Sequence, residues 1–549
     1  MKNERLFLVL YPEIIFYKKE YMKKKLWLNG KIYTVDEKQK WAEAIVTEGN
    51  KIVFVGSNND AKSFVGNDCE EFDFQNKLVL PGFIDSHVHF MIGGLSLTKL
   101  DLSNVKSKEQ FRKAVKEYSK SNSAEWILGG NWNHLQFDEK VLPTKEWIDD
   151  ITNKPVYLTR VDIHTALANS AALKIAGINK DTSAPDGGQI LRDSKGEPTG
   201  ILKDTAMKLI SNLIPPPTEE EYSNALKAAQ KAALSNGITS VHDITEDKLR
   251  KIYQRSYETN KLQMRINCIH LIQELDLLIE RNLFNKSGND FIRTGAVKAF
   301  ADGSLGSNTA WFFEPYNDDP TTTGLPTDYM TNGQFKKWAI LADMHKIQLV
   351  VHAIGDRAIS EVLDVFEEIV EINPKWERRF RIEHVQHIKE KDIERMKKLN
   401  VIASMQPSQL YDDGVWAEEK IGKERLKGTH AVKTLLDNGI KICLGSDWTV
   451  TPLNVIHGID IVVNRKTKDG ANPEGWIPEE KISVEHAVKA YTLDAAFASF
   501  EENIKGSIEV GKLADFVVLS ENIFEIPSKE IQHVTVVNTI LDGENISHT

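Results

Sequence analysis

Cysteine is scarce in this chain, with only Cys69, Cys268 and Cys443 among 549 residues. Their odd number and wide spacing, without a CxxC pair, argue against a disulfide framework and against a cysteine-based zinc knuckle. A reducing, cytoplasmic location is therefore expected.

Long apolar runs and an excess of positive charge are also missing. No run of about 18 uninterrupted apolar residues occurs, so no membrane span is predicted. Lysine and arginine total 69 against 79 aspartates and glutamates, a net charge of -10, which argues against a nucleic-acid partner. The composition, 41% hydrophobic and 27% charged, is typical of a soluble globular enzyme. At 549 residues the chain exceeds one compact core, so at least two structural units are expected.

Residues 1–23 are set apart from the rest. A charged start followed by a short apolar stretch imitates a signal peptide, but Pro12 and Glu13 interrupt that stretch and no small-residue cleavage site follows. Met22 begins a more ordinary opening. Residues 1–21 are interpreted either as an upstream extension from a mis-assigned start or as a disordered or docking tail.

Strand-like segments occupy both ends of the chain. Residues 24–82 contain short apolar strands broken at NG and GN turns, and residues 503–549 repeat this pattern with Gly and Asp turns. Because domain termini tend to lie close together, the two segments are predicted to form one small β-sandwich domain. It would flank a large central domain at residues 83–502.

The central domain alternates short apolar strands with amphipathic stretches, which predicts the α/β class and a closed (β/α)8 TIM barrel. The interval at residues 91–236, after the first barrel strand, is too long for an ordinary connection. It is predicted to be an inserted subdomain that serves as lid and specificity wall. The eight expected strands are LVLPGFIDSH, ITSVHDI, MRINCIHLI, AVKAFAD, LVVHAIG, RFRIEHV, NVIASMQP and KICLGSD.

Candidate metal ligands stand at the ends of five of these strands. His87 and His89 in PGFIDSHVH are separated by one residue, so both rings would project to the same side. Singly, the later candidates have ordinary alternatives as hydrogen-bonded core histidines or a helix-capping aspartate. Together they predict a metal site at the carboxyl end of the barrel, where imidazole and carboxylate suit zinc, with iron or manganese as alternatives. The later candidates are Lys298, His352, His384 and Asp447.

With these candidate ligands at the strand ends, the chain resembles the amidohydrolase superfamily of metal-dependent hydrolases over nearly its whole length from about residue 24. The segments GGNWNHLQF, LTRVDIHTALANSAAL, GEPTGILKD, KAFADGSLGSNTAWF, HAIGDRAI, RIEHVQ and GKLADFVVL are similar to those of the subgroup containing the N-substituted formamide deformylases. The resemblance implies one or two divalent ions. It assigns the first to His87, His89 and Asp447, and the second to His352 and His384.

In this family the position of Lys298 is commonly carboxylated. The resemblance therefore implies that Lys298 adds carbon dioxide and becomes a carbamate that bridges the two ions. The alternative is a lysine that extends to solvent from a strand edge, but its setting in AVKAFAD is apolar, where an unpaired charge is costly.

The expected reaction is hydrolysis of a carbon–nitrogen bond other than a peptide bond, in a small-molecule amide or an N-acyl or N-formyl amine. A metal-bound hydroxide would attack the carbonyl, and Asp447 would act as general base and pass the proton to the leaving nitrogen. A lactone or phosphoester hydrolase with the same site is one alternative, and a non-catalytic binding protein is another. Dimers are common among relatives, so a homodimer is expected.

Further residues are predicted to line the substrate site. His164 and His242 could hydrogen-bond the substrate or serve as structural histidines. Trp132 and Trp311 could form apolar walls or take part in ordinary packing. Asp302 is expected to orient the loop that follows Lys298.

Overall fold

The computed structural model describes residues 23–65, 69–138, 140–162, 164–284 and 287–546. The predicted extension at residues 1–23 lies outside the described residues except for Lys23. Within these ranges, no helix combines the length and the apolar character that crossing a bilayer requires.

Eight parallel strands form the centre of the molecule and follow one another in chain order around a barrel. The first and last strands approach through a parallel bridge between Val88 and Trp448, which nearly closes the barrel. Most of them are rich in β-branched and apolar residues, although β20 is mostly polar, and their parallel order confirms the predicted α/β barrel. The strands are β8 (Phe83–Val88), β15 (Ile238–Thr245), β16 (Arg265–Leu271), β18 (Ile292–Phe300), β19 (Gln348–Ala353), β20 (Arg381–His384), β21 (Ile402–Met405) and β22 (Ile442–Leu444).

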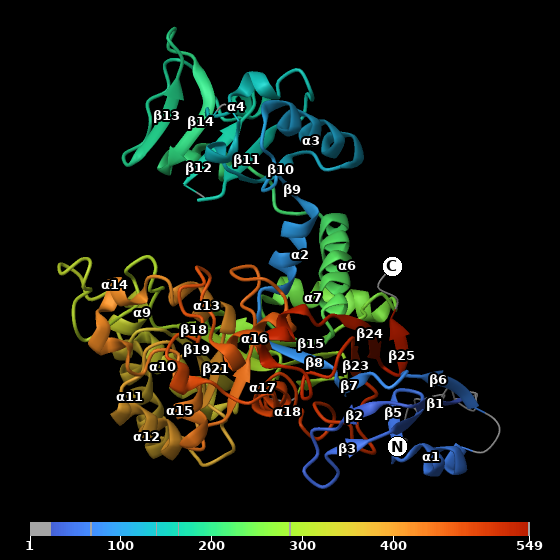
Figure 1. The fold of residues 1–549 in the computed structure, drawn as a ribbon. Coiled ribbons are helices and arrows are strands. Elements are labelled where there is room, and N and C mark those ends of the chain that lie inside the picture. The colour runs from blue at the N-terminus through green and yellow to red at the C-terminus, as the bar shows by residue number, and fades with distance from the viewer. Residues whose placement is uncertain (1–22, 66–68, 139, 163, 285–286, 547–549) are drawn as a thin grey trace, which may run out of the picture.

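Amphipathic helices cover the outside of this barrel (Figure 1). Helix α11 is representative, because Ile359, Val362, Leu363 and Phe366 recur at helical spacing and are fully buried. The ring of Phe366 stacks on Phe380 with centroids 4.1 Å apart. The covering helices are α7 (Asp247–Glu258), α8 (Leu275–Glu280), α10 (Gln334–Met344), α11 (Asp356–Ile372), α12 (Glu390–Leu399), α15 (Val432–Asp437), α17 (Val484–Ala490) and α18 (Leu493–Ala498). Helices α9 (Asp328–Thr331), α13 (Pro407–Asp413) and α14 (Ala417–Ile421) belong to connections between barrel strands, and α16 (Val455–Asn464) follows the last of these strands.

Both ends of the chain contribute to two further sheets beside the barrel. One sheet has the order β5-β4-β1-β6 and the other the order β25-β24-β23-β7-β2-β3, so the second joins strands from both ends. Trp27, Ile45 and Phe516 belong to one buried cluster that contains side chains from both sheets. The strands are β1 (Lys24–Leu28), β2 (Lys31–Tyr33), β3 (Trp41–Ala42), β4 (Ala44–Glu48), β5 (Lys51–Gly56), β6 (Cys69–Asp73), β7 (Leu78–Pro81), β23 (Phe516–Leu519), β24 (Val536–Leu541) and β25 (Glu544–Ile546), with helix α1 (Asn58–Val65) beside them.

A buried ion pair fastens the barrel to the carboxyl-terminal strands. The guanidinium of Arg265, at the start of β16, donates to both carboxylate oxygens of Asp515 at 2.6 and 2.8 Å. It also donates to Asp542 at 2.8 Å. Only 1% of the Arg265 side chain is exposed, so water cannot replace a lost partner.

Replacing Arg265 by methionine should therefore lower the free energy of unfolding by about 3–5 kcal/mol, because the buried carboxylate of Asp515 loses its counter-charge inside the protein. Urea denaturation of both proteins measures the difference. Arg255→Met is the matched control, since the ion pair between Arg255 and Glu219 is exposed, and its loss should cost less than about 1 kcal/mol. Equal losses in the two variants would contradict the role assigned to Arg265.

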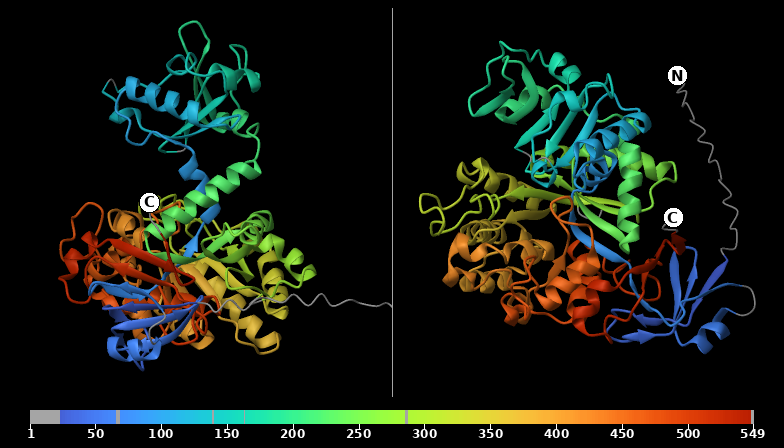
Figure 2. Two further views of the ribbon diagram at one scale, coloured as in Figure 1. Left: turned by 90° about the vertical axis from the view of Figure 1, so that its right-hand side faces the viewer. Right: turned by 45° about the horizontal axis from the view of Figure 1, so that its top comes forward.

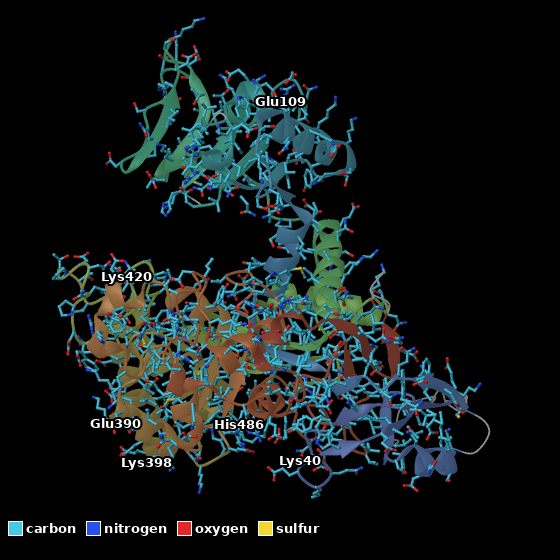
Figure 3. All side chains as sticks on the ribbon, viewed as in Figure 1. Lys40, Glu109, Glu390, Lys398, Lys420 and His486 are labelled. Atoms are coloured by element: carbon cyan, nitrogen blue, oxygen red, sulfur yellow. The ribbon has the colours of Figure 1, made fainter. Side chains whose placement is uncertain are left out.

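Between β8 and β15 the chain leaves the barrel and forms a separate sheet with the order β13-β14-β12-β11-β10-β9. Figure 1 shows this insertion above the barrel, joined to it at helices α2 and α6, and the left view of Figure 2 shows the same arrangement. With side chains drawn, Glu109 of the insertion lies far from Lys420 on the barrel (Figure 3). The elements are α2 (Phe90–Thr98), β9 (Leu100–Asp101), α3 (Lys108–Ser121), β10 (Ile127–Trp132), β11 (Val156–Arg160), β12 (Thr165–Ala168), α4 (Ser170–Ile175), β13 (Gly188–Arg192), β14 (Pro198–Asp204), α5 (Lys208–Ser211) and α6 (Glu219–Ser235).

Helices α2 and α6, which we call the stalk, pack at very close range. A methyl group on Gly94 of α2 would lie 2.2 Å from the carbonyl oxygen of Ala225 in α6. A methyl group on Gly93 would lie 2.3 Å from the ring of Trp448. Only glycine fits at these two positions, so α2 is clamped between α6 and the residue that follows Asp447.

Candidate metal centre

Three of the predicted ligands converge at the carboxyl ends of the barrel strands. His87 comes from β8, His384 from the end of β20, and Asp447 from the turn after β22. One donor atom of each lies within 4.8 Å of the others, and all three residues are buried. Donors so close together can share one cation.

The spacing around Asp447 fits a coordinated ion. Asp447 Oδ1 lies 3.4 Å from Nε2 of His87 and 3.5 Å from Nε2 of His89. Two donors of a tetrahedral ion with bonds of ~2.1 Å are about 3.4 Å apart. Burial by itself raises the pKa of Asp447, but the nearby His87 and His89 hold that pKa below its usual range, so Asp447 is an anionic donor.

His352 and Lys298 stand beside these donors. The ring of His352 lies 4.4 Å from the ring of His384, centroid to centroid, while its Nε2–H donates to the carbonyl of Gly303 at 3.0 Å. Nζ of Lys298 is buried without a hydrogen-bond partner among the described residues. It lies 5.1 Å from the ring of Phe300. Burial lowers the pKa of Lys298 to about 8.

Two of the converging residues have an unusual backbone. His384 has φ = 75° and Asp447 has φ = 57°, the left-handed region that residues other than glycine rarely adopt. The turn at His384 explains how two adjacent residues, Glu383 and His384, both reach the site, since neighbours in a regular strand face opposite sides.

Glu383 and Arg381 belong to this centre, although our sequence analysis did not include them. The carboxylate of Glu383 accepts from Nδ1–H of His87 and pairs with Arg381. Arg381 in turn donates to the carbonyl of Ser86 and, at 3.1 Å, to the hydroxyl of Ser404. Both charges are fully buried. A carboxylate on Nδ1 fixes the tautomer of His87 and leaves Nε2 facing the other donors. The sequence signal is the alternation of Arg381 and Glu383 around Ile382 in a fully buried strand.

Asp85 holds the backbone around His87 in place where the first and last barrel strands meet. Its Oδ1 accepts from the backbone amides of Ser446 at 2.9 Å and His87 at 3.2 Å. Burial raises its pKa to about 7. A methyl group on Gly445 would lie 2.6 Å from the amide nitrogen of His87, so glycine permits this close approach of the two strands.

Two of the predicted lining residues are buried near the converging donors. His242 lies inside the barrel, and Asp302 lies beside His352. His242 is fully buried, and its Nδ1 accepts from Arg381 at 2.9 Å. Asp302 accepts from the amides of Trp311, Ile354 and Gly355 at 2.8–3.0 Å and lies 3.4 Å from Nε2 of His352. Burial raises the pKa of Asp302 to about 7. Through these contacts Asp302 ties the loop that follows Lys298 to the end of β19.

Of the other three predicted lining residues, two belong to the insertion, and Trp311 follows the loop that Asp302 holds. Trp132 is fully buried inside the insertion, where its indole donates to the carbonyl of Leu158 at 2.9 Å. It presents no surface to a substrate, because the insertion needs a large apolar side chain for its own core. The His164 side chain is 73% exposed and pairs with Asp204. Trp311 is buried against the stacked guanidinium of Arg357.

His387, three residues after His384, is a buried histidine that offers a test of pH dependence. Its Nδ1 contacts the hydroxyl of Thr429 at 2.9 Å. Burial, reinforced by His430 and Arg425, lowers its pKa well below 6.5. Below about pH 6.5 the unfolded chain therefore binds a proton at His387 that the folded chain does not, and stability is lost as the pH falls.

Replacing His387 by glutamine should remove this part of the pH dependence. From about pH 6.5 down to 5, wild type should lose about 1.4 kcal/mol per pH unit more than the variant does. Urea denaturation of both metal-free proteins between pH 5 and 8 measures the two slopes. The curves should run parallel above pH 7.5, and parallel curves down to pH 5 would contradict the prediction.

Comparison with known proteins places the chain in a family. Residues 70–546 match the amidohydrolase family. The chain is 38% identical to the protein LONG AFTER FAR-RED 3 of Arabidopsis thaliana, covering 94% of this chain and 90% of that protein. It is 34% identical to the putative amidohydrolase YtcJ of Bacillus subtilis, covering 95% and 99%. It is 27% identical to the N-substituted formamide deformylase of Arthrobacter pascens, covering 94% and 97%.

The solved structures give the same result. An uncharacterized metal-dependent hydrolase from Pyrococcus furiosus superposes with a TM-score of 0.77 at 29% identity, covering 91% of this chain and 100% of that one. The match to the family model, the barrel and the converging donors agree with one another. The chain therefore belongs to the amidohydrolase family, and its metal-dependent relatives support a hydrolase.

Proposed function

We propose that this protein is a metal-dependent hydrolase of carbon–nitrogen bonds other than peptide bonds, with a small N-acyl or N-formyl amine as substrate. The observation that carries the proposal is the convergence of His87, His384 and Asp447 within 4.8 Å in a member of the amidohydrolase family. The similarity to an N-substituted formamide deformylase supports the substrate class.

The residues that would hold metal are His87, His89 and Asp447 for one ion and His352 and His384 for a second. Zinc suits this donor set, and iron or manganese are alternatives. When bound, such an ion lowers the pKa of a water molecule and polarises the substrate carbonyl. The buried Nζ of Lys298, without a hydrogen-bond partner in the described part of the chain, supports a carbamate at this position, because a carbamate would pair with the metal ions that an ammonium repels.

Asp447 is the proposed general base. Its carboxylate is anionic and stands at the mouth of the barrel, so it can take a proton from the attacking water and deliver it to the leaving nitrogen. The insertion at residues 91–236 is proposed to act as lid and specificity wall, since its stalk rises from the carboxyl end of β8 (Figure 1).

Two measurements on wild type test this function. Protein purified without chelator should contain one or two equivalents of divalent metal by elemental analysis. A panel of N-formyl amines, N-acyl amines, lactones and phosphotriesters should show turnover of the amines. Turnover of lactones or phosphotriesters alone would assign the site to the other hydrolase class. Absence of both metal and turnover would indicate a non-catalytic binding protein.

Replacing Lys298 by alanine tests the bridge. We expect loss of metal and of turnover, together with loss of a carbamate signal in ¹³C NMR after incubation with labelled bicarbonate. Lys505→Met is the matched control, because Lys505 is another buried lysine, paired with Glu501 at 2.9 Å, and should keep all three properties. Unaltered metal content and turnover in Lys298→Ala would refute the bridging role.

A further inference from the structure

One glutamine side chain joins two of the converging residues. Gln409, on α13, accepts at Oε1 from Nδ1–H of His384 at 3.2 Å. Its Nε2 donates to Oδ2 of Asp447 at 2.8 Å. We infer that Gln409 is a positioning residue, whose amide sets the orientation of both the imidazole and the carboxylate toward the metal.

The amide decides which atoms remain free for a metal. Since Nδ1 of His384 is a donor to Gln409, the ring carries its proton there and its Nε2 lone pair is left for the site. Since Oδ2 of Asp447 is engaged by Gln409, the oxygen that faces Nε2 of His87 and His89 is Oδ1.

A second glutamine fixes the orientation of the first. Nε2 of Gln386 donates to Oε1 of Gln409 at 2.6 Å. Oε1 therefore accepts two hydrogen bonds while Nε2 donates to a carboxylate. Turning the amide over would place its NH₂ group against two donors and its oxygen against the Asp447 carboxylate, which the network forbids.

The backbone of both partners explains why a tether is needed. His384 and Asp447 each have a positive φ, a conformation that persists only where the surroundings hold it. Gln409 contacts both residues at once, from a helix that neither of them belongs to. A single side chain thus restrains two strained positions.

The inference rests on the metal site of the proposed function. Titration with Co²⁺ distinguishes failure of the metal site from failure of the role assigned to Gln409. Co²⁺ is titrated into metal-free protein while its visible absorption bands are recorded, so that affinity and ligand geometry are read without any substrate. Wild type should bind with a distinct spectrum. Failure of wild type to bind would overturn the metal site together with this inference.

Gln409→Met should bind Co²⁺ about 10- to 100-fold more weakly than wild type, with shifted absorption bands. Gln409→Asn should behave in the same way, because its amide is one methylene too short to reach both partners. Gln348→Met is the control, since Gln348 is also buried and bonded, to the carbonyls of Arg379 at 2.7 Å and Ala498 at 3.0 Å. It should lose stability but keep the affinity and spectrum of wild type.

The comparison distinguishes positioning from general packing. Wild-type affinity and bands in both Gln409 variants, with Co²⁺ bound normally by wild type, would overturn the inference and leave the proposed function standing. Equal weakening in Gln348→Met would also overturn it, because any buried glutamine would then have the same effect.

Discussion

Replacing Asp447 by asparagine should reduce turnover of the amine substrate by about 10²- to 10⁴-fold, the range that a general base contributes. Asparagine keeps the shape and an oxygen donor but cannot accept the proton from water. The loss should therefore fall mainly on kcat, while metal content falls less. Steady-state kinetics and elemental analysis of the same preparation measure the two effects.

A matched control separates this effect from the loss of a buried charge. Asp460 on α16 is buried and lies 3.3 Å from Nζ of Lys466. Asp460→Asn should keep kcat within a few-fold of wild type. A kcat for Asp447→Asn within three-fold of wild type, with metal present, would show that another group acts as the base.

The second large effect is expected at Glu383. Replacing it by glutamine removes the negative charge beside the buried Arg381 guanidinium and leaves one amide oxygen where two carboxylate oxygens face Arg381 and Nδ1–H of His87. We expect a loss of about 3–5 kcal/mol in the free energy of unfolding. We also expect a 10- to 100-fold loss of metal affinity. Urea denaturation and titration with Zn²⁺ measure these separately.

The double variant Arg381→Met with Glu383→Gln shows whether the losses of stability and of metal affinity have the same cause. Removing both charges should restore part of the stability, because no unpaired charge remains inside the barrel. Metal affinity should stay low, since His87 still lacks its carboxylate. Recovery of metal affinity in the double variant would show that Glu383 acts only by neutralising Arg381.

Much of the barrel is predictable from the sequence, because its strands are short β-branched runs and helix-forming stretches separate most of them. The convergence of His87, His384 and Asp447 is also predictable, since parallel strands of a barrel place their carboxyl ends at one rim. Strand periodicity and this rule are sufficient to predict that these three side chains lie close together.

Other parts depend on geometry that a sequence does not reveal. Glu383 and His384 are neighbours, and periodicity alone would place them on opposite faces; the left-handed backbone at His384 brings both inward. The contact made by Gln409 depends on where α13 lies over the strands. The sequence allowed Trp132 either to line the substrate site or to pack in a core. In the structure it packs in the separate core of the insertion.

The stalk has a mechanical consequence for the metal centre. His89 is the residue immediately before α2, and that same helix supports the insertion at its other end. Helix α2 also packs against Trp448, the residue after Asp447, so the root of the insertion and the candidate centre share one close contact. If His89 and Asp447 hold a cation, any displacement of α2 that separates these two residues would lower the affinity for that cation, and by thermodynamic reciprocity the bound cation would oppose the displacement.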